Sequence, residues 1–281
     1  MIAKYKESAM RIVFLLCACV SILAVALICI FLFANGLPAM AEIGVFKFLF
    51  GTTWSPSQGE FGILPMIVGS IYVTAGAILI GVPIGILCAV FLAKYCPKPL
   101  YKMMKPAIEL LAGIPSVVYG FFGLVVIVPI MRQLVGTGKN VLTASVLLGM
   151  MILPTIVSVS ESALRAVPKA YYEGALALGA THERSVFGVT LPAAKSGVAA
   201  GVVLGVGRAL GEALAVSMIA GNQAVIPGSL FDGVRTLTSN IVVEMGYAEG
   251  LHKEALIAKA VVLFVFFMVI NVSFSQFKKK G

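Results

Sequence analysis

Six long apolar segments limit what this chain can fold into. To within a few residues they cover 12–34, 66–93, 108–131, 141–160, 198–221 and 256–277. Each is close to the roughly 20 apolar residues that an α-helix needs to cross the hydrocarbon core of a bilayer. Because an open strand cannot satisfy its backbone groups in lipid, all six are interpreted as transmembrane helices. The predicted fold class is therefore an all-α integral membrane protein.

The charged residues agree with a lipid-embedded chain. They make up 12% of the sequence, whereas soluble domains have about 25%. The net charge of +9 could indicate nucleic acid binding, but the basic residues lie at the ends of apolar segments. No basic run lies on an aromatic-interleaved or amphipathic stretch of the kind that nucleic acid binding needs. We therefore predict that the chain is embedded in membrane lipid and does not bind nucleic acid.

The distribution of lysine and arginine predicts the orientation, because positively charged flanks stay on the cytoplasmic side. The tail 1–11, the connections 94–107 and 161–197, and the C-terminus together carry 14 basic residues, whereas the alternate connections carry 5. Both termini are therefore expected in the cytoplasm. The first apolar run of 23 residues is longer than a signal-peptide core of roughly 7–15, so we expect a retained span. Residues 12–281 then form one transmembrane domain.

The outer connection 35–65 is rich in aromatic side chains. They are Phe46, Phe48, Phe50, Trp54 and Phe61. An interfacial segment at headgroup depth explains them most simply, and a docking surface for an external partner is the alternative.

Glycines recur every four residues in the fifth apolar segment. Gly197, Gly201 and Gly205 form one stripe, and Gly207 and Gly211 repeat the interval on a rotated stripe. Small residues at this spacing let two helix backbones approach closely. We expect helix packing here and no ligand role.

The cytoplasmic connection 161–197 is longer than a membrane hairpin needs and carries helix signals of its own. Pro168 can open a helix that Gly179 ends in a left-handed cap. Thr181 can cap a second helix that Leu191 and Pro192 stop. Two short cytoplasmic helices favour a docking surface for a cytoplasmic partner.

The amino-acid sequence of this connection resembles a known motif. Residues 173–179 read EGALALG, and after nine more residues 189–192 read VTLP. This pattern is similar to the EAA loop of bacterial ABC importer permeases, with Gly174 in place of one alanine and Val189 in place of isoleucine. The resemblance implies that this loop is the coupling helix of a six-helix, MetI-like type I importer. The implied contacts with the ATPase are Glu173, Gly174, Ala175, Gly179, Leu191 and Pro192.

Two further stretches narrow the resemblance. Residues 109–120 read ELLAGIPSVVYG and residues 207–216 read GRALGEALAV. Both are similar to the phosphate-specific permease family PstC, and the likeness extends from about Trp54 to the final span. It implies a bacterial cell-membrane subunit that imports inorganic phosphate with ATPase subunits, a sister permease and an extracytoplasmic phosphate-binding protein. ATP hydrolysis would be carried out by the partner, so this chain is not expected to be an enzyme.

Two charges lie inside the fifth apolar segment. Arg208 is 11 residues past Gly197, about 16 Å along a helix and near the midplane of a roughly 30 Å core. Glu212 follows one turn later and is expected on the same face. Each charge costs roughly 2.5–3.5 kcal/mol at the centre of a span, which indicates a protein or water-filled interior. We expect Arg208 to bind the anion and Glu212 to hold it when the site is empty, with a structural ion pair as the alternative.

Hydroxyl groups beside prolines on other spans are the expected neighbours of Arg208. Ser116 and Tyr119 lie beside Pro115, and Thr155 and Ser158 lie near Pro154. Each one taken singly is more often a helix-to-helix hydrogen bond than a ligand.

Other classes of function are less favoured by the sequence. No nucleotide-binding loop, catalytic triad or His/Cys cluster is present, so no cofactor or metal is expected. A proton-coupled secondary transporter could use Arg208 and Glu212 as a relay, but it has no reason to carry the cytoplasmic motif. Permeases for molybdate, tungstate or sulfate remain alternatives, because these are tetrahedral oxyanions too.

Overall fold

The computed structural model describes residues 2–279 and is almost wholly helical. The helices are α1 (Ile2–Ile43), α2 (Val45–Phe50), α3 (Leu64–Val90), α4 (Lys98–Gly113), α5 (Ser116–Phe122), α6 (Val128–Val135), α7 (Val141–Ala166), α8 (Lys169–Ala177), α9 (His182–Ser185), α10 (Leu191–Ala193), α11 (Lys195–Gly211), α12 (Leu214–Ile219), α13 (Leu237–Glu244) and α14 (Gly250–Lys279). Three π-helical turns extend or join them: η2 (Phe91–Tyr95), η3 (Gly123–Ile127) and η4 (Val186–Thr190). One two-stranded hairpin, β1 (Trp54–Ser55) and β2 (Glu60–Phe61), encloses the 3-10 turn η1 (Pro56–Gln58).

Five helical segments of the described chain are long and apolar enough to cross a membrane. They are Met10–Ile43, Leu64–Tyr95, Ser116–Val135, Val141–Ala166 and Gly250–Ser273. A sixth arises if His182–Ala193 and Lys195–Gly211, which are bent by 70° relative to each other, are counted as one span. The all-helical membrane fold expected from the sequence is confirmed, but several bounds differ.

The third span begins later than expected. The prediction placed it at 108–131, but residues up to Gly113 belong to α4, which carries lysines and has no buried residue. Pro115 has no N–H to donate and disfavours helical geometry in the residue before it. Ile114 is accordingly extended, with ψ at 127°, and the apolar span starts at Ser116.

The fifth span is broken. The prediction was one helix over 198–221, but α11 ends at Gly211 and α12 begins at Leu214. Between them Glu212 is extended, with φ at −74° and ψ at 120°. The expectation that Arg208 and Glu212 share one helix face is therefore wrong, because no continuous helix joins them.

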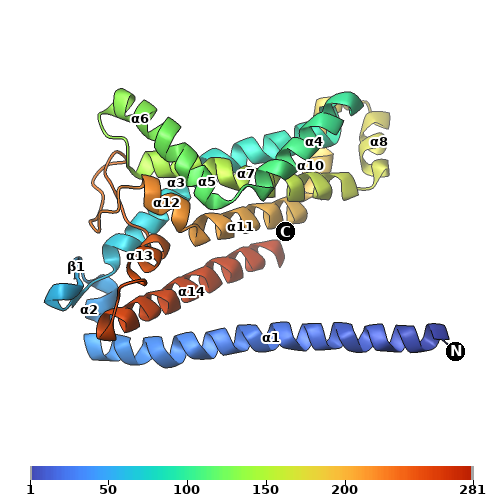
Figure 1. The fold of residues 1–281 in the computed structure, drawn as a ribbon. Helices are drawn as coiled ribbons and strands as arrows, with labels where there is room; N and C mark the ends of the chain where they lie inside the picture. The colour runs from blue at the N-terminus through green and yellow to red at the C-terminus, as the bar shows by residue number, and fades with distance from the viewer. Residues whose placement is uncertain (1, 280–281) are drawn as a thin grey trace.

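The centre of the bundle is α7, with α3 and α11 packed along it (Figure 1). The glycines explain how closely α11 approaches. A methyl group at Gly201 would lie 3.0 Å from the Ser160 hydroxyl, and one at Gly205 would lie 2.8 Å from Ile156. Gly197 faces Ala163 in the same way, whereas Gly207 faces Phe267 of α14. Gly211 has nothing within 4 Å, so packing does not account for it.

The first and last helices pair along one side of the bundle. Phe33 of α1 and Phe264 of α14 meet edge to face with ring centroids 6.0 Å apart. Toward its N-terminus α1 stands away from the rest of the chain (Figure 1). Helix α1 already begins at Ile2, so the expected tail 1–11 continues the first span as helix. Of the C-terminal lysines counted above, Lys280 lies outside the described residues.

The connection between α1 and α3 forms a small cap made of α2 and the hairpin. Phe48 and Phe61 are buried in it, whereas Phe46 is 80% exposed. Trp54 and Phe61 face each other across the hairpin, with ring centroids 5.6 Å apart. Only some of these aromatics are thus available to an interface or a partner.

Candidate functional site

Arg208 lies in the last turn of α11 and is half-buried. Its guanidinium Nη1 donates to the Thr155 hydroxyl of α7 at a distance of 3.3 Å. No other hydrogen bond or ion pair of the described residues involves this side chain. Because a guanidinium has several donors in a planar fork, most of its capacity remains for an anion.

Glu212 does not pair with Arg208 in this structure. Its carboxylate accepts from the backbone N–H of Ala215 at 3.0 Å, at the start of α12. Its carbonyl, which the end of α11 leaves without a helical donor, accepts from the Thr238 hydroxyl of α13 at 3.0 Å. Glu212 therefore stabilises the break between α11 and α12.

Tyr119 and Ser116 lie on α5, beside the break. Gly120 of α5 approaches Ala215 so closely that a methyl group there would lie 2.9 Å from the Ala215 backbone. The Tyr119 hydroxyl donates to the Leu111 carbonyl at 2.9 Å and so bridges the interruption at Pro115. No described hydrogen bond joins Tyr119 to Arg208.

Ser158 is half-buried on α7, three residues from Thr155 and thus on the same side of that helix. The structure brings Arg208 and Thr155 into contact and leaves Ser116 and Ser158 outside hydrogen-bond distance of Arg208 among the described contacts. A cavity of about 420 Å³ opens beside Tyr119. Its walls are Leu111, Ile114, Val118, Tyr119, Phe122, Met150 and Leu153.

The connection between α7 and α11 has the expected local structure in its first part. Helix α8 covers Lys169–Ala177, Gly179 is left-handed with φ at 82°, and the Thr181 hydroxyl accepts from the N–H of Arg184. The expected stop at Leu191 and Pro192 is wrong, because these residues begin the short α10, which leads into α11. The expected bounds 161–197 include the ends of α7 and α11.

The outward face of α8 is unusually open. Glu173, Gly174 and Leu176 are exposed, and Leu178 just after the helix is 91% exposed. Two large apolar side chains, Leu176 and Leu178, are thus exposed on this side of the turn. Ala175 is half-buried on the inner side, and Pro192 is exposed.

Comparison with protein families identifies the family to which the chain belongs. Residues 81–280 match the family "Binding-protein-dependent transport system inner membrane component". The chain belongs to this family of ABC transporter permeases. The permease is a multi-pass membrane protein that works with a separate ATPase and other subunits; ATP hydrolysis is not its own activity.

Curated relatives of the permease extend over most of its length. The probable ABC transporter permease protein YqgH of Bacillus subtilis is 44% identical and covers 84% of this chain and 79% of its own. The phosphate transport system permease protein PstC of Mesorhizobium japonicum is 36% identical and covers 86% of this chain and 81% of its own.

Solved structures share the fold at low sequence identity. The MetNI methionine ABC transporter, described as inward facing, matches with a TM-score of 0.64 at 21% identity and covers 81% of this chain and 99% of that chain. A bacterial ABC transporter involved in alginate import matches with a TM-score of 0.61 at 15% identity and covers 85% of this chain and 83% of that chain. These likenesses establish the fold of the permease alone.

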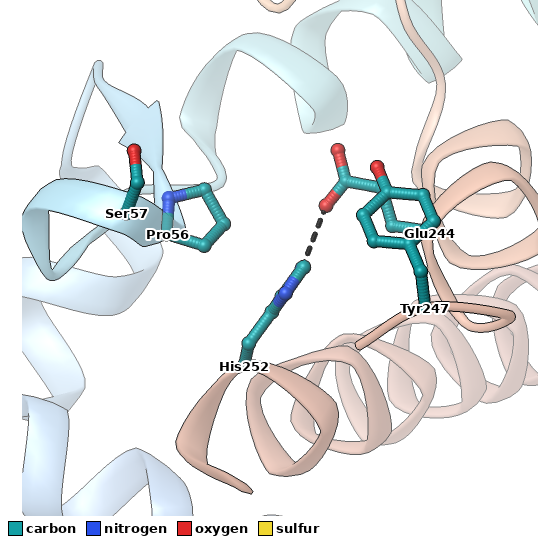
Figure 2. Close-up of a pocket in the computed structure, with 5 residues that line it drawn as sticks. All are labelled: Pro56, Ser57, Glu244, Tyr247 and His252. Carbon is teal, nitrogen blue, oxygen red and sulfur yellow. Dashed lines mark hydrogen bonds and ion pairs between the residues drawn. The ribbon is translucent and has the colours of Figure 1, made fainter. Parts of the chain in front are cut away.

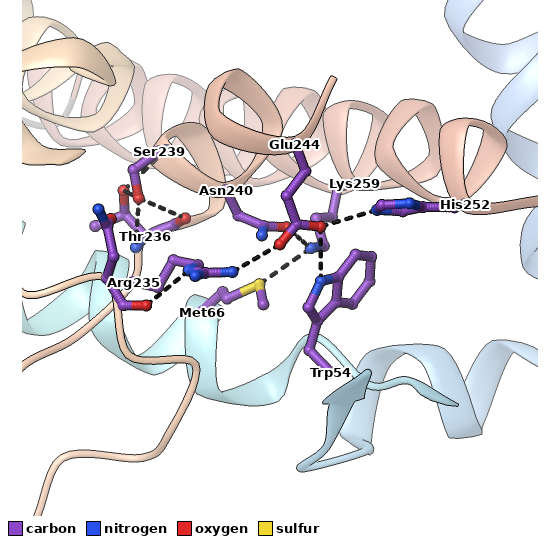
Figure 3. A network of polar contacts seen from close by, with 10 residues as sticks. Trp54, Met66, Arg235, Thr236, Ser239, Asn240, Glu244, His252 and Lys259 are labelled. Atoms are coloured by element: carbon purple, nitrogen blue, oxygen red, sulfur yellow. Dashed lines mark hydrogen bonds and ion pairs between the residues drawn. The ribbon is translucent and has the colours of Figure 1, made fainter. Parts of the chain in front are cut away.

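The permease also contains a buried polar network that the sequence analysis missed (Figure 3). Glu244 of α13 is at its centre and accepts from Trp54 at 2.9 Å, from Arg235 at 2.7 Å and from His252 at 2.9 Å. Burial alone would raise the pKa of the Glu244 carboxyl, but the surrounding donors and cations outweigh burial and hold that pKa below its ordinary value.

Lys259 of α14 completes this network and is fully buried. Its ammonium contacts Asn240, lies 3.1 Å from the Met66 sulfur and sits 3.0 Å from the centroid of the Trp54 ring. A lysine inside the expected span 256–277 was the one sequence signal for it. A cavity of about 430 Å³ opens beside the network (Figure 2). It is lined by Pro56, Ser57, Glu244, Tyr247 and His252.

A second buried carboxylate lies near the end of α7 that leads into α8. Glu161 of α7 accepts from Lys105 at 2.7 Å, from Tyr101 at 2.8 Å and from Arg165. Arg165 also donates to the Leu92 carbonyl at 2.8 Å. These bonds hold α4 and the end of α3 against α7, directly before the chain enters α8.

Proposed function

We propose that this chain is the PstC-type subunit of a phosphate importer, and that Arg208 is the main anion-binding residue of its path. The observation that carries the proposal is the state of Arg208. It is a half-buried cation within an apolar bundle whose only described bond is a long one to Thr155. A cation held this loosely at such a depth is costly unless it serves a transported or bound anion.

Phosphate is the favoured anion for two reasons. Relatives that match most of the chain are named as phosphate transport permeases. A planar guanidinium also matches two oxygens of a tetrahedral oxyanion at once. Thr155 adds a hydroxyl next to the guanidinium. Ser116, Tyr119 and Ser158 are proposed as further hydroxyls of the path, which a moving anion would meet without any contact to Arg208 in this structure.

The proposed assembly has three kinds of partner. ATPase subunits of the PstB type dock on the coupling loop. The proposed contacts are Glu173, Gly174, Ala175, Gly179, Leu191 and Pro192. A sister permease of the PstA type covers the exposed apolar face of α5, where Val117, Val118 and Phe121 are 48%, 53% and 60% exposed. A phosphate-binding protein of the PstS type delivers the anion from outside.

The orientation proposed places both termini in the cytoplasm. The start of α1 and the end of α14 lie toward the same end of the bundle as α8, whereas α2 and β1 lie at the opposite end (Figure 1). The basic connections thus gather at one end, which supports a cytoplasmic assignment for that end.

Phosphate uptake by Arg208 variants tests the site. We expect Arg208→Ala to assemble at the wild-type level and to reduce phosphate uptake by at least about a hundredfold, since a charge-assisted hydrogen bond contributes roughly 1.5–3 kcal/mol and the fork makes two. Arg208→Lys keeps the charge without the fork and should recover only part of the uptake. Uptake is measured in proteoliposomes and normalised to the amount of assembled complex. Near-normal uptake by Arg208→Ala would reject the site.

Competition decides which oxyanion is transported. Labelled phosphate uptake is measured with excess unlabelled phosphate, molybdate, tungstate or sulfate. We expect only unlabelled phosphate to compete strongly. Strong competition by another of these anions, together with direct uptake of it, would reassign the substrate and leave the role of Arg208 as an oxyanion ligand intact.

A further inference from the structure

Helix α8 has an inner face as well as an exposed one. Tyr172 points inward, is half-buried, and packs against a cluster built from the ends of α3, α7 and α11. The cluster contains Ala89, Val90, Leu164, Val186, Ala194 and Val198. A helix of 9 residues is too short to be stable in isolation, so these inner contacts decide where α8 lies.

One hydrogen bond closes the turn at the end of α8. The Tyr172 hydroxyl and the Nδ1 atom of His182 are 2.6 Å apart. His182 is the first residue of α9, and the bond therefore spans the left-handed Gly179. Because Thr181 caps α9 through its hydroxyl, the backbone at His182 is held in place.

His182 also contacts the cytoplasmic end of the second span. Its ring meets the ring of Tyr95 in η2 edge to face, with centroids 4.6 Å apart and an angle of 75°. Lys94, the preceding residue, has its ammonium 5.7 Å from the centroid of the Tyr172 ring. His182 thus touches α8 on one side and the end of α3 on the other.

We propose that His182 is a positioning residue that fixes α8 against the end of α3, so that a displacement of α8 is passed to the second span. The inference rests on the proposed role of α8 as the contact with the ATPase. Helix α3 packs along α7 through the centre of the bundle, and Thr155 of α7 contacts Arg208. Movement that enters at α8 therefore reaches the helices around the anion site through His182.

The chain offers matched variants for this test. His182→Ala removes both contacts, whereas His182→Asn can place an amide near the Nδ1 position and restore the bond to Tyr172. Tyr172→Phe removes the hydroxyl that bonds to His182. Tyr95→Phe is its control, because the Tyr95 hydroxyl is buried but has no hydrogen-bond partner among the described residues. Tyr171→Phe, on the exposed side, controls for loss of a hydroxyl from α8 itself.

Two readouts are measured on the intact complex with its ATPase. The first is hydrogen exchange of the backbone of residues 169–178. The second is phosphate taken up per ATP hydrolysed in proteoliposomes. His182→Ala and Tyr172→Phe should raise the exchange rate and lower the uptake per ATP by roughly five- to tenfold, in line with loss of one short hydrogen bond. His182→Asn restores the bond to Tyr172 but not the ring contact with Tyr95, so it should recover most of the protection from exchange and only part of the uptake per ATP. The two control variants should behave like wild type.

Three results would overturn the proposal. They are unchanged exchange and coupling in His182→Ala, an effect of Tyr95→Phe as large as that of Tyr172→Phe, and a His182→Asn variant that recovers either none of the protection from exchange or all of the coupling. Failure of the proposed function gives a different pattern. If the wild-type complex binds its ATPase but takes up no phosphate, the substrate assignment fails. The exchange rates, with the stimulation of ATP hydrolysis by the permease, then decide the role of His182.

Discussion

Arg208 and Lys259 are two cations inside apolar helices, and their surroundings differ. Lys259 is fully buried and touches an amide oxygen, a sulfur atom and the face of an indole ring. Arg208 is half-buried and has one described hydrogen bond, at 3.3 Å. Removing one partner of a buried charge whose donors are all occupied destabilises a fold, whereas a charge with donors to spare is available to a ligand.

The same contrast separates two carboxylates, Glu244 in the network of Lys259 and Glu212 four residues after Arg208 in the sequence. Glu244 accepts from three side chains and lies close to Lys259. Glu212 accepts from a single backbone N–H and stabilises a helix break. In the network of Glu244 and Lys259 the polar groups thus contact one another, whereas Arg208 keeps donors that have no described partner. Substitutions in the Glu244 and Lys259 network should lower stability, and substitutions around Arg208 should impair transport.

The largest effect on stability is expected at Lys259. Lys259→Ala leaves a cavity and removes the ammonium from Asn240, so we expect a loss of about 2–5 kcal/mol in unfolding free energy. Lys259→Met fills the volume without the charge and should lose less. Thermal unfolding of the purified complex measures both, with Arg208→Ala as the comparison that should unfold at the wild-type temperature. A Lys259→Ala complex that is fully stable but inactive would reverse the roles assigned to the two cations.

A smaller, pH-dependent effect is expected at Glu244. The folded-state pKa of this carboxyl lies below the ordinary value of 4.5. Its contribution to stability is therefore complete above pH 4.5 and is lost as the pH falls through the folded-state pKa. Glu244→Gln, which keeps an acceptor for Arg235, should unfold at a lower temperature at neutral pH and show a flatter decline in acid. An identical acid decline in wild type and variant would assign the effect to other groups.

The sequence predicted what depends on composition along the chain and missed what depends on contacts between distant residues. Long apolar runs predicted the spans because the bilayer sets their length. Both breaks were missed, although Pro115 gave a signal for one. The other lies where the Glu212 carbonyl accepts from Thr238 of α13, a contact between residues 26 apart that the sequence pattern does not reveal. The network around Glu244 joins Trp54 to Glu244, which are 190 residues apart in the sequence. The periodicity of apolar residues carries no information about such a pair.

The smallest effect, and the finest test of the comparison, is expected at Thr155. Thr155→Val keeps the shape of the side chain and removes the one described hydrogen bond to Arg208. At 3.3 Å this bond is long, so its loss should cost about 0.5 kcal/mol, or about a twofold change in the apparent affinity for phosphate. Ser162→Ala, two turns away on α7, removes an exposed hydroxyl that lies outside the proposed site and should leave the affinity unchanged. The apparent KM of uptake is measured for both variants, with the unfolding temperature alongside. If Thr155→Val lowers the unfolding temperature as much as Lys259→Ala does, then Arg208 belongs to a closed structural set like that of Lys259, and its donors are not spare.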